Sequence, residues 1–251
     1  MSIDVIDLRS FYASPLGAVA RRFVGGAIDK QWPSCVGQSV LGIGYATPYI
    51  ETLRKDTVRT LAFMPAEQGV VNWPSSGPSA SALVDVTALP LPDSCIDRVL
   101  IVHALEMADQ PHELMSEVWR VLAPGGRMIL VAPNRAGVWA RFDSTPFGHG
   151  RPYSASQLRS LLRDTLFSPV YWGDALYAPP FTRPYLLRSA PVFEAIGRKM
   201  SLPWAGVHII EATKQLYRPS LAGRSAHRRA FRLQPAIAAG GRLADEPVTR
   251  A

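Results

Sequence analysis

The chain has few cysteines, no long apolar run and no basic N-terminal segment. Its two cysteines, Cys35 and Cys95, have no neighbouring Cys or His at metal-ligand spacing, so the sequence predicts neither a metal site nor a disulfide framework. No stretch approaches the roughly 20 apolar residues of a membrane helix. Segment 1–10 carries Asp4 and Asp7 instead of the basic start of a signal peptide. We therefore expect a cytoplasmic chain without a membrane span.

The excess of positive charge is almost confined to the C-terminal segment. The net charge is +7, but residues 214–251 hold eight Lys/Arg and two acidic residues, which leaves +1 for residues 1–213. This segment mixes arginines with Ala, Gly and Pro and has almost no aromatics, a composition typical of a solvated, disordered tail. A contact of the basic tail with nucleic acid stays open, although the near-neutral body offers no phosphate track.

Strand-like and helix-like runs alternate along the chain. Strands are predicted at 39–43, 58–63, 81–85, 97–102, 127–132, 170–172 and 208–212. Helices are predicted at 5–30, from after Pro48 to about residue 55, and at 109–122, 154–166 and 185–200. This order predicts an α/β, Rossmann-like fold with a mostly parallel seven-stranded sheet and helices on both faces. We expect a helical segment at 1–34, one domain at 35–213 with an insertion at about 175–204, and the tail at 214–251.

Two motifs in the middle of the chain carry a resemblance to a known family. Residues 89–97 read LPLPDSCID, residues 117–126 read EVWRVLAPGG, and Pro133-Asn134 follow the next predicted strand. Over residues 38–134 the chain resembles the type 11 methyltransferase domain of the class I S-adenosylmethionine-dependent enzymes. The resemblance implies the class I methyltransferase fold, S-adenosylmethionine as the cofactor and methyl transfer to a small-molecule acceptor.

The third predicted strand ends at a residue that matches the family's adenine-binding acid. That residue is Asp85, and the resemblance implies that Val86 and Thr87 offer backbone hydrogen bonds to the adenine ring. From the residues alone, Asp85 is equally an ordinary turn former.

The glycine turn after the first strand departs from the family pattern of an acidic residue followed by two spaced glycines. Here the turn reads Gly42-Ile43-Gly44-Tyr45-Ala46. Gly44 keeps the place where the backbone approaches the ligand. Gly42 replaces the acid, which removes a carboxylate that would attract the cationic end of the cofactor, and Ala46 replaces the last glycine. We assign Gly42, Gly44, Tyr45 and Ala46 to the cofactor site by this match.

The end of the second strand also departs from the pattern. This fold usually presents a carboxylate there to the ribose hydroxyls, whereas this chain has Phe63 and Met64, with Glu67 and Gln68 several residues later. Phe63 and Met64 are predicted beside the adenine, with packing in the core as the alternative.

Candidate catalytic residues lie after the fourth and fifth strands. Methyl transfer needs a placed nucleophile and, where that nucleophile is protonated, a base. His149 is predicted as this base and Arg151 as the anchor of an anionic acceptor group, within a Gly-rich loop at 142–153. His103, directly after the fourth strand, is predicted in the methyl-transfer cleft and beside the cofactor. The alternative for each is a purely structural role.

The leading hypothesis is therefore an S-adenosylmethionine-dependent methyltransferase that acts on a small or medium acceptor through oxygen, nitrogen or carbon. The departures at Gly42 and Ala46 and the missing ribose carboxylate favour a rival, a noncatalytic regulator or scaffold whose basic tail contacts nucleic acid or a protein partner. An RNA methyltransferase is a third hypothesis. The sequence fixes neither the acceptor nor the oligomeric state.

Overall fold

The structure of the chain is a computed structural model that describes residues 3–181, 183–200 and 202–216. The predicted basic tail and its contact with nucleic acid lie almost wholly outside the described residues.

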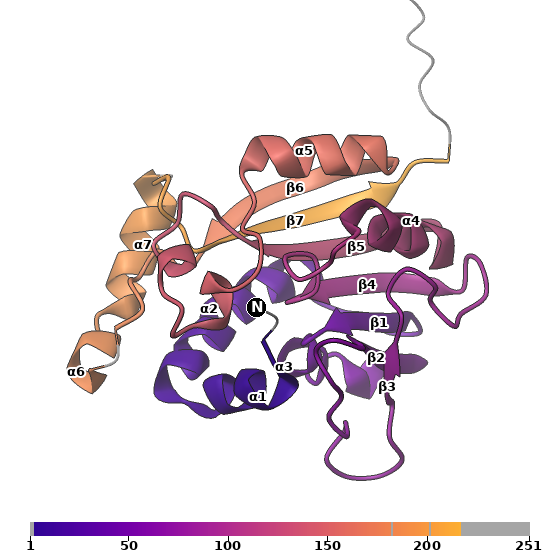
Figure 1. The fold of residues 1–251 in the computed structure, drawn as a ribbon, viewed down its shortest axis with the longest axis horizontal. Helices are drawn as coiled ribbons and strands as arrows, with labels where there is room; N and C mark the ends of the chain where they lie inside the picture. The colour runs from indigo at the N-terminus through magenta and orange to yellow at the C-terminus, as the bar shows by residue number, and fades with distance from the viewer. Residues whose placement is uncertain (1–2, 182, 201, 217–251) are drawn as a thin grey trace, which may run out of the picture. The chain divides into compact units, whose positions relative to one another are not determined.

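Within the described residues, seven strands form one sheet in the order β3-β2-β1-β4-β5-β7-β6 (Figure 1). The strands are β1 (Ser39–Gly44), β2 (Arg59–Pro65), β3 (Ser81–Val84), β4 (Ile96–Val102), β5 (Leu122–Pro133), β6 (Phe167–Ala175) and β7 (Val207–Lys214). β1 to β5 pair in parallel, and β7 is antiparallel to both of its neighbours. The predicted α/β fold class with a mostly parallel seven-stranded sheet is confirmed.

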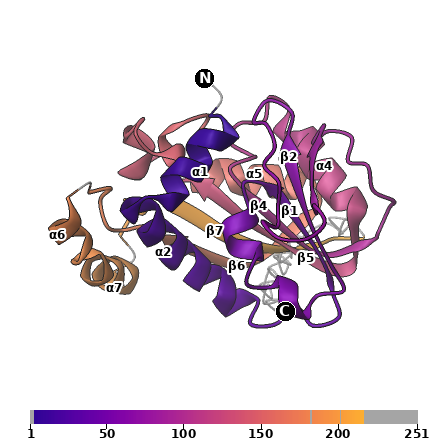
Figure 2. The same ribbon diagram turned by 90° about the horizontal axis from the view of Figure 1, so that it is seen from below.

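Helices cover both faces of the sheet, as the apolar strands require. Leu100 and Val102 of β4 pack on one side with α1 (Val5–Ala13), α2 (Pro15–Gln31) and α3 (Thr47–Ile50). Val99 and Ile101 pack on the other side with α4 (Pro111–Val121) and α5 (Ala155–Asp164). Figures 1 and 2 show these two helical layers. The alternation of side chains along β4 thus divides the apolar interior into two clusters.

The N-terminal segment forms two helices where one was predicted over 5–30. Ser14 ends α1 in an extended conformation, and its hydroxyl accepts a hydrogen bond from the backbone N–H of Gly17 while Pro15 opens α2. A capping serine followed by proline is a strong helix start. The helix predicted from after Pro48 to about residue 55 begins earlier and is shorter, because α3 starts at Thr47 and ends at Ile50, and a 3-10 turn, η1 (Arg54–Asp56), follows.

Short helices connect the later strands. After β5 come the 3-10 turns η2 (Trp139–Arg141) and η3 (Pro146–Gly148), and between β6 and β7 come α6 (Pro184–Leu187) and α7 (Ala190–Met200). Both views place α6 and α7 at one end of the molecule (Figures 1 and 2). None of the helices in the described part of the chain is long and apolar enough to span a membrane.

Candidate functional site

A pocket of about 560 Å³ opens at the carboxyl ends of β2, β3 and β4. Its lining comes from four segments. Residues 65–68 lie at the end of β2, residues 85–87 follow β3, and residues 104 and 106–110 follow β4. Gly150 and Arg151 come from the loop after η3. Loops at the carboxyl ends of parallel strands are the usual ligand site of open α/β sheets. We call this cavity the strand-end pocket.

Asp85 lies in the strand-end pocket directly after β3, and it forms a tight turn. Its Oδ1 accepts hydrogen bonds from the backbone N–H of Thr87 at 2.8 Å and from the Thr87 hydroxyl at 2.6 Å. These bonds lower the pKa of the Asp85 carboxyl and keep it ionised. The Thr87 N–H that was predicted for the adenine is therefore engaged by Asp85, whereas Val86 lines the pocket beside it.

Gly44 joins the glycine turn to the neighbouring strand. Its φ is +77°, and a Cβ atom at this position would lie 2.2 Å from the carbonyl oxygen of Val102. The next residue, Tyr45, donates its backbone N–H to that same oxygen at 2.9 Å. Glycine is thus required here for the close approach of β1 to β4 as well as for the backbone conformation.

The two departures from the family's glycine pattern, Gly42 and Ala46, face each other. A Cβ atom on Gly42 would lie 2.8 Å from the Cβ of Ala46 and 2.9 Å from Cδ1 of Ile50 in α3. The methyl group of Ala46 therefore occupies the space that a side chain at position 42 would need. The missing acid at position 42 and the additional methyl at position 46 are therefore sterically linked.

Phe63 and Met64 are buried on opposite faces of the sheet. Phe63 packs in the cluster beneath α4 and α5, and Met64 packs in the cluster beneath α1 to α3. The Met64 sulfur accepts a hydrogen bond from the Val71 N–H at 3.5 Å. The structure thus places both side chains in the apolar interior, and the strand-end pocket begins at the following residue, Pro65.

Tyr12 of α1 covers the glycine turn and contacts a buried histidine. Its ring stacks on Tyr45 with centroids 5.5 Å apart, and its hydroxyl lies 2.9 Å from Nε2 of His103 and 3.0 Å from the hydroxyl of Tyr49. On the other side of the imidazole, Nδ1 lies 3.1 Å from Oε1 of Glu106. A carboxylate, an imidazole and a hydroxyl therefore stand in one hydrogen-bonded row.

His103, the middle residue of this row, has a strained backbone conformation. Its φ is +54°, which is rare for a residue with a side chain. Its carbonyl oxygen accepts a hydrogen bond from Nε2 of Gln68 at 2.9 Å, and its ring lies 4.8 Å from that of Phe147. Contacts on three sides thus fix a residue at the end of β4, and strain of this kind is concentrated at functional sites.

Two buried oxygen atoms beside the strand-end pocket have no hydrogen-bond partner among the described residues. They are Oε1 of Gln68 and Oε2 of Glu106. Both residues line the pocket and are only 2% exposed. A buried acceptor without a partner is costly, so such atoms often mark the place of an absent ligand or ion.

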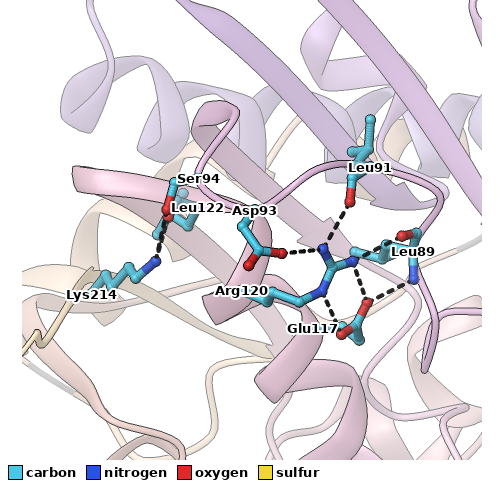
Figure 3. A network of polar contacts seen from close by, with 8 residues as sticks. All are labelled: Leu89, Leu91, Asp93, Ser94, Glu117, Arg120, Leu122 and Lys214. Atoms are coloured by element: carbon cyan, nitrogen blue, oxygen red, sulfur yellow. Dashed lines mark hydrogen bonds and ion pairs between the residues drawn. The ribbon is translucent and has the colours of Figure 1, made fainter.

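The two sequence motifs at 89–97 and 117–126 form a polar network that fastens the loop after β3 (Figure 3). The guanidinium of Arg120 donates to the carbonyl oxygens of Leu89 and Leu91, to Asp93 and to Glu117. Glu117 in turn accepts the backbone N–H of Leu89 at 2.8 Å. The residues of this network do not line the strand-end pocket. They support the loop that follows β3.

Comparison with known proteins identifies the family. The model of a family described as a methyltransferase domain matches residues 32–130. A probable S-adenosylmethionine-dependent methyltransferase of Mycolicibacterium smegmatis is 29% identical over 140 residues, which are 53% of each chain. Residues 32–130 thus match a methyltransferase domain, and the relatives support the class I S-adenosylmethionine-dependent type. The resemblance inferred from the motifs is confirmed, and S-adenosylmethionine is the cofactor of this family.

Other relatives of this methyltransferase domain match over shorter or more divergent regions. A ubiquinone/menaquinone biosynthesis C-methyltransferase of Acidiphilium cryptum is 42% identical over 59 residues, 24% of each chain. The chain thus spans about half, or less, of the curated relatives it matches. A methyltransferase structure from Archaeoglobus fulgidus has a TM-score of 0.56 at 19% identity and covers 77% of this chain and 94% of its own. A structure described as a [4+2]-cyclase has the same TM-score at 22% identity, covering 79% and 82%. These structures show the fold alone.

The residues of the methyltransferase domain fit the family's cofactor at one end of the site. The strand-end pocket combines an ionised carboxyl at Asp85 with unpartnered acceptors at Gln68 and Glu106, which suits the donors of an adenosine and a neighbouring cation. At the glycine turn, Tyr12 would have to move for the cofactor to bind, because its ring covers that of Tyr45 and both rings are buried.

The two residues predicted at the acceptor site line different cavities. His149 lines a pocket of about 620 Å³ beside α1 and α2, and its Nε2 lies 2.8 Å from the carbonyl oxygen of Asp143. That nitrogen must carry the proton of the bond, which leaves Nδ1 for any base function. Arg151 lines the strand-end pocket, with a side chain 70% exposed and 3.8 Å from Asp109. Their roles stay predictions.

Sequence reasoning overlooked Glu106 and did not predict the contact of Tyr12 with His103. Glu106 follows His103 by three positions, a spacing that places a carboxylate within reach of an imidazole in a turn. This short spacing directly after a buried strand was an available signal. The contact of Tyr12 with His103 joins residues 91 positions apart, and the local sequence contains no signal for it.

Proposed function

We propose that the chain is an S-adenosylmethionine-dependent methyltransferase that methylates a small or medium acceptor. The cofactor supplies the methyl group: its carbon–sulfur bond breaks as the acceptor's nucleophile bonds to that carbon, and the sulfonium becomes a neutral thioether. The observation that carries the proposal is the strand-end pocket, which lies after β2, β3 and β4 and contains Asp85 next to two unpartnered buried acceptors. The noncatalytic alternative receives no comparable support.

Asp85, Val86 and Gln68 are proposed to hold the adenosine. Replacing Asp85 by alanine should weaken binding of S-adenosylhomocysteine about tenfold, since one hydrogen bond to a charged group is lost. Isothermal titration calorimetry on the full chain measures this effect. Asp143→Ala, an exposed acid outside the strand-end pocket, is the matched control and should leave the affinity unchanged. Equal affinities of all three proteins would refute the assignment of Asp85.

The acceptor is proposed to enter through the pocket beside α1 and α2. Phe11 lines this pocket, and its ring lies 6.2 Å from that of Phe147, which in turn contacts His103. The apolar wall favours an acceptor with an apolar ring or chain, in keeping with the ubiquinone/menaquinone biosynthesis C-methyltransferase among the relatives. Transfer of labelled methyl groups to acceptors of graded polarity tests this proposal, and a preference for strongly polar acceptors would contradict it.

His103 is proposed as the base that accepts the acceptor's proton. Its Nδ1 faces Glu106, which holds the imidazole so that Nε2 points to the hydroxyl of Tyr12. A carboxylate that fixes the tautomer of a histidine is a common arrangement for proton abstraction. The proposal requires Tyr12 to yield its place to the acceptor. Once an acceptor is known, His103→Gln should lower kcat far more than KM, and a change in KM alone would contradict this role.

A further inference from the structure

The strand-end pocket has an acidic lining in a chain that is basic overall. Glu67, Asp85, Glu106 and Asp109 contribute carboxyl groups to it, and Arg151 contributes the single guanidinium of its lining, while the chain has a net charge of +7. The guanidinium is 70% exposed and lies 3.8 Å from Asp109, so solvent and this neighbour screen much of its charge. The pocket is therefore suited to a cation.

Glu106 differs from the other acids because its side chain is only 1% exposed. Its Oε1 contacts Nδ1 of His103 at 3.1 Å, and its Oε2 has no partner among the described residues. When the Tyr12 hydroxyl donates to Nε2, the imidazole is neutral and Nδ1–H donates to Glu106. In that arrangement Glu106 faces a neutral hydrogen-bond donor at Oε1, and its Oε2 is directed at no partner among the described residues.

The surroundings of Glu106 amplify the effect of its charge. Its backbone oxygen accepts the N–H of Arg151 at 2.8 Å, and Gly150 packs so closely that a Cβ there would lie 2.4 Å from that oxygen. These contacts fix the backbone of Glu106, and its side chain, at 1% exposure, is shielded from water. A charge in such a place acts over several ångströms with little screening, so it needs no direct contact with a ligand.

We propose that Glu106 discriminates the cationic cofactor from the neutral product of methyl transfer. The inference rests on the proposed function above. S-adenosylmethionine carries one more positive charge than S-adenosylhomocysteine, because transfer converts its sulfonium to a thioether. The carboxylate attracts the sulfonium and loses this attraction when the methyl group leaves, so it favours cofactor binding and product release in the same site.

Calorimetry with three ligands tests the proposal on the full chain. The ligands are S-adenosylmethionine, S-adenosylhomocysteine and sinefungin, whose amine provides a stable positive charge near the place of the sulfonium. Glu106→Gln should weaken binding of the two cationic ligands about tenfold and change S-adenosylhomocysteine binding less than about twofold. Asp109→Asn removes an acid of the same pocket whose side chain is 93% exposed, and should affect all three ligands slightly and equally.

The outcomes separate this inference from the proposed function. If Glu106→Gln weakens all three ligands equally, or none of them, the charge discrimination is wrong while the cofactor site remains. If the unsubstituted protein binds none of the ligands, the proposed function itself fails. If Glu106→Gln does not fold, binding to the unsubstituted protein still tests the inference. Tighter binding of S-adenosylhomocysteine than of both sinefungin and S-adenosylmethionine would overturn it.

Discussion

The hydroxyl of Tyr12 and Nε2 of His103 lie 2.9 Å apart and join the first helix to the end of the central strand β4. The same hydroxyl lies 3.0 Å from that of Tyr49, so one oxygen connects three elements of the fold. Burial raises the pKa of Tyr12 well above its ordinary value, which keeps the phenol protonated and able to donate. This contact holds α1 over the glycine turn.

Tyr12→Phe removes this hydroxyl and keeps the ring that stacks on Tyr45. We expect the free energy of unfolding to fall by about 1–3 kcal/mol, because His103 and Tyr49 each lose a buried partner. Urea denaturation measures the change. Tyr153→Phe is a matched control, since its hydroxyl makes only a 3.5 Å contact with the Leu105 carbonyl oxygen. If both variants lose the same free energy of unfolding, the Tyr12 hydroxyl contributes no more to stability than the Tyr153 hydroxyl.

Gly42 and Ala46 should behave as a coupled pair. Gly42→Ala places a methyl group 2.8 Å from the Cβ of Ala46 and should cost about 1–3 kcal/mol of unfolding free energy through overpacking. Ala46→Gly removes this contact and leaves only the one at 2.9 Å with Cδ1 of Ile50, the end of a flexible side chain, so the double variant should recover about 1 kcal/mol relative to the sum of the two single changes. Denaturation of the four proteins gives this coupling energy.

Gly26→Ala is the control for this cycle. Gly26 lies in α2, and a Cβ atom there would meet nothing within 4 Å. This substitution should stabilise the protein by about 0.5–1 kcal/mol, as alanine does in an open helical position. Additive effects at Gly42 and Ala46 would mean that the two departures from the family pattern are independent.

The sequence was sufficient to predict the sheet and the family but not the environment of the site. Periodicity located the strands, and the motifs at 89–97 and 117–126 predicted a methyltransferase domain by their resemblance to the family. In the structure these motifs are joined by contacts of Arg120 and Glu117 with the loop at Leu89. Glu106 is buried, and its backbone oxygen contacts Gly150 and Arg151, which approach from a distant loop. Such contacts depend on the packing of segments far apart in the chain, and no local pattern encodes them.

The Arg120 network should give stability that depends on pH. Hydrogen bonds from Arg120 hold the pKa of the Glu117 carboxyl below its ordinary value of 4.5. A carboxyl with a lowered folded pKa stabilises the protein above its unfolded pKa, and this contribution is lost as the pH falls through the folded value. Glu117→Gln should therefore cost about 1.5–3 kcal/mol at pH 7 and progressively less below about pH 4.

Denaturation of both proteins across this pH range measures the difference. Glu51→Gln is the control, because Glu51 is 53% exposed and pairs with Arg54 only at 3.8 Å. Its effect should be small at every pH. A cost at Glu117 that stays constant down to pH 3 would contradict the assignment of the lowered pKa to the Arg120 contacts.

Equilibrium binding of S-adenosylmethionine to the full chain tests the central claim most directly. The account predicts saturable one-to-one binding in calorimetry, competition by S-adenosylhomocysteine and a loss of affinity on replacing Asp85. The absence of any binding up to millimolar ligand, in a protein that unfolds cooperatively, would contradict it and show that the glycine turn beneath Tyr12 no longer admits the cofactor.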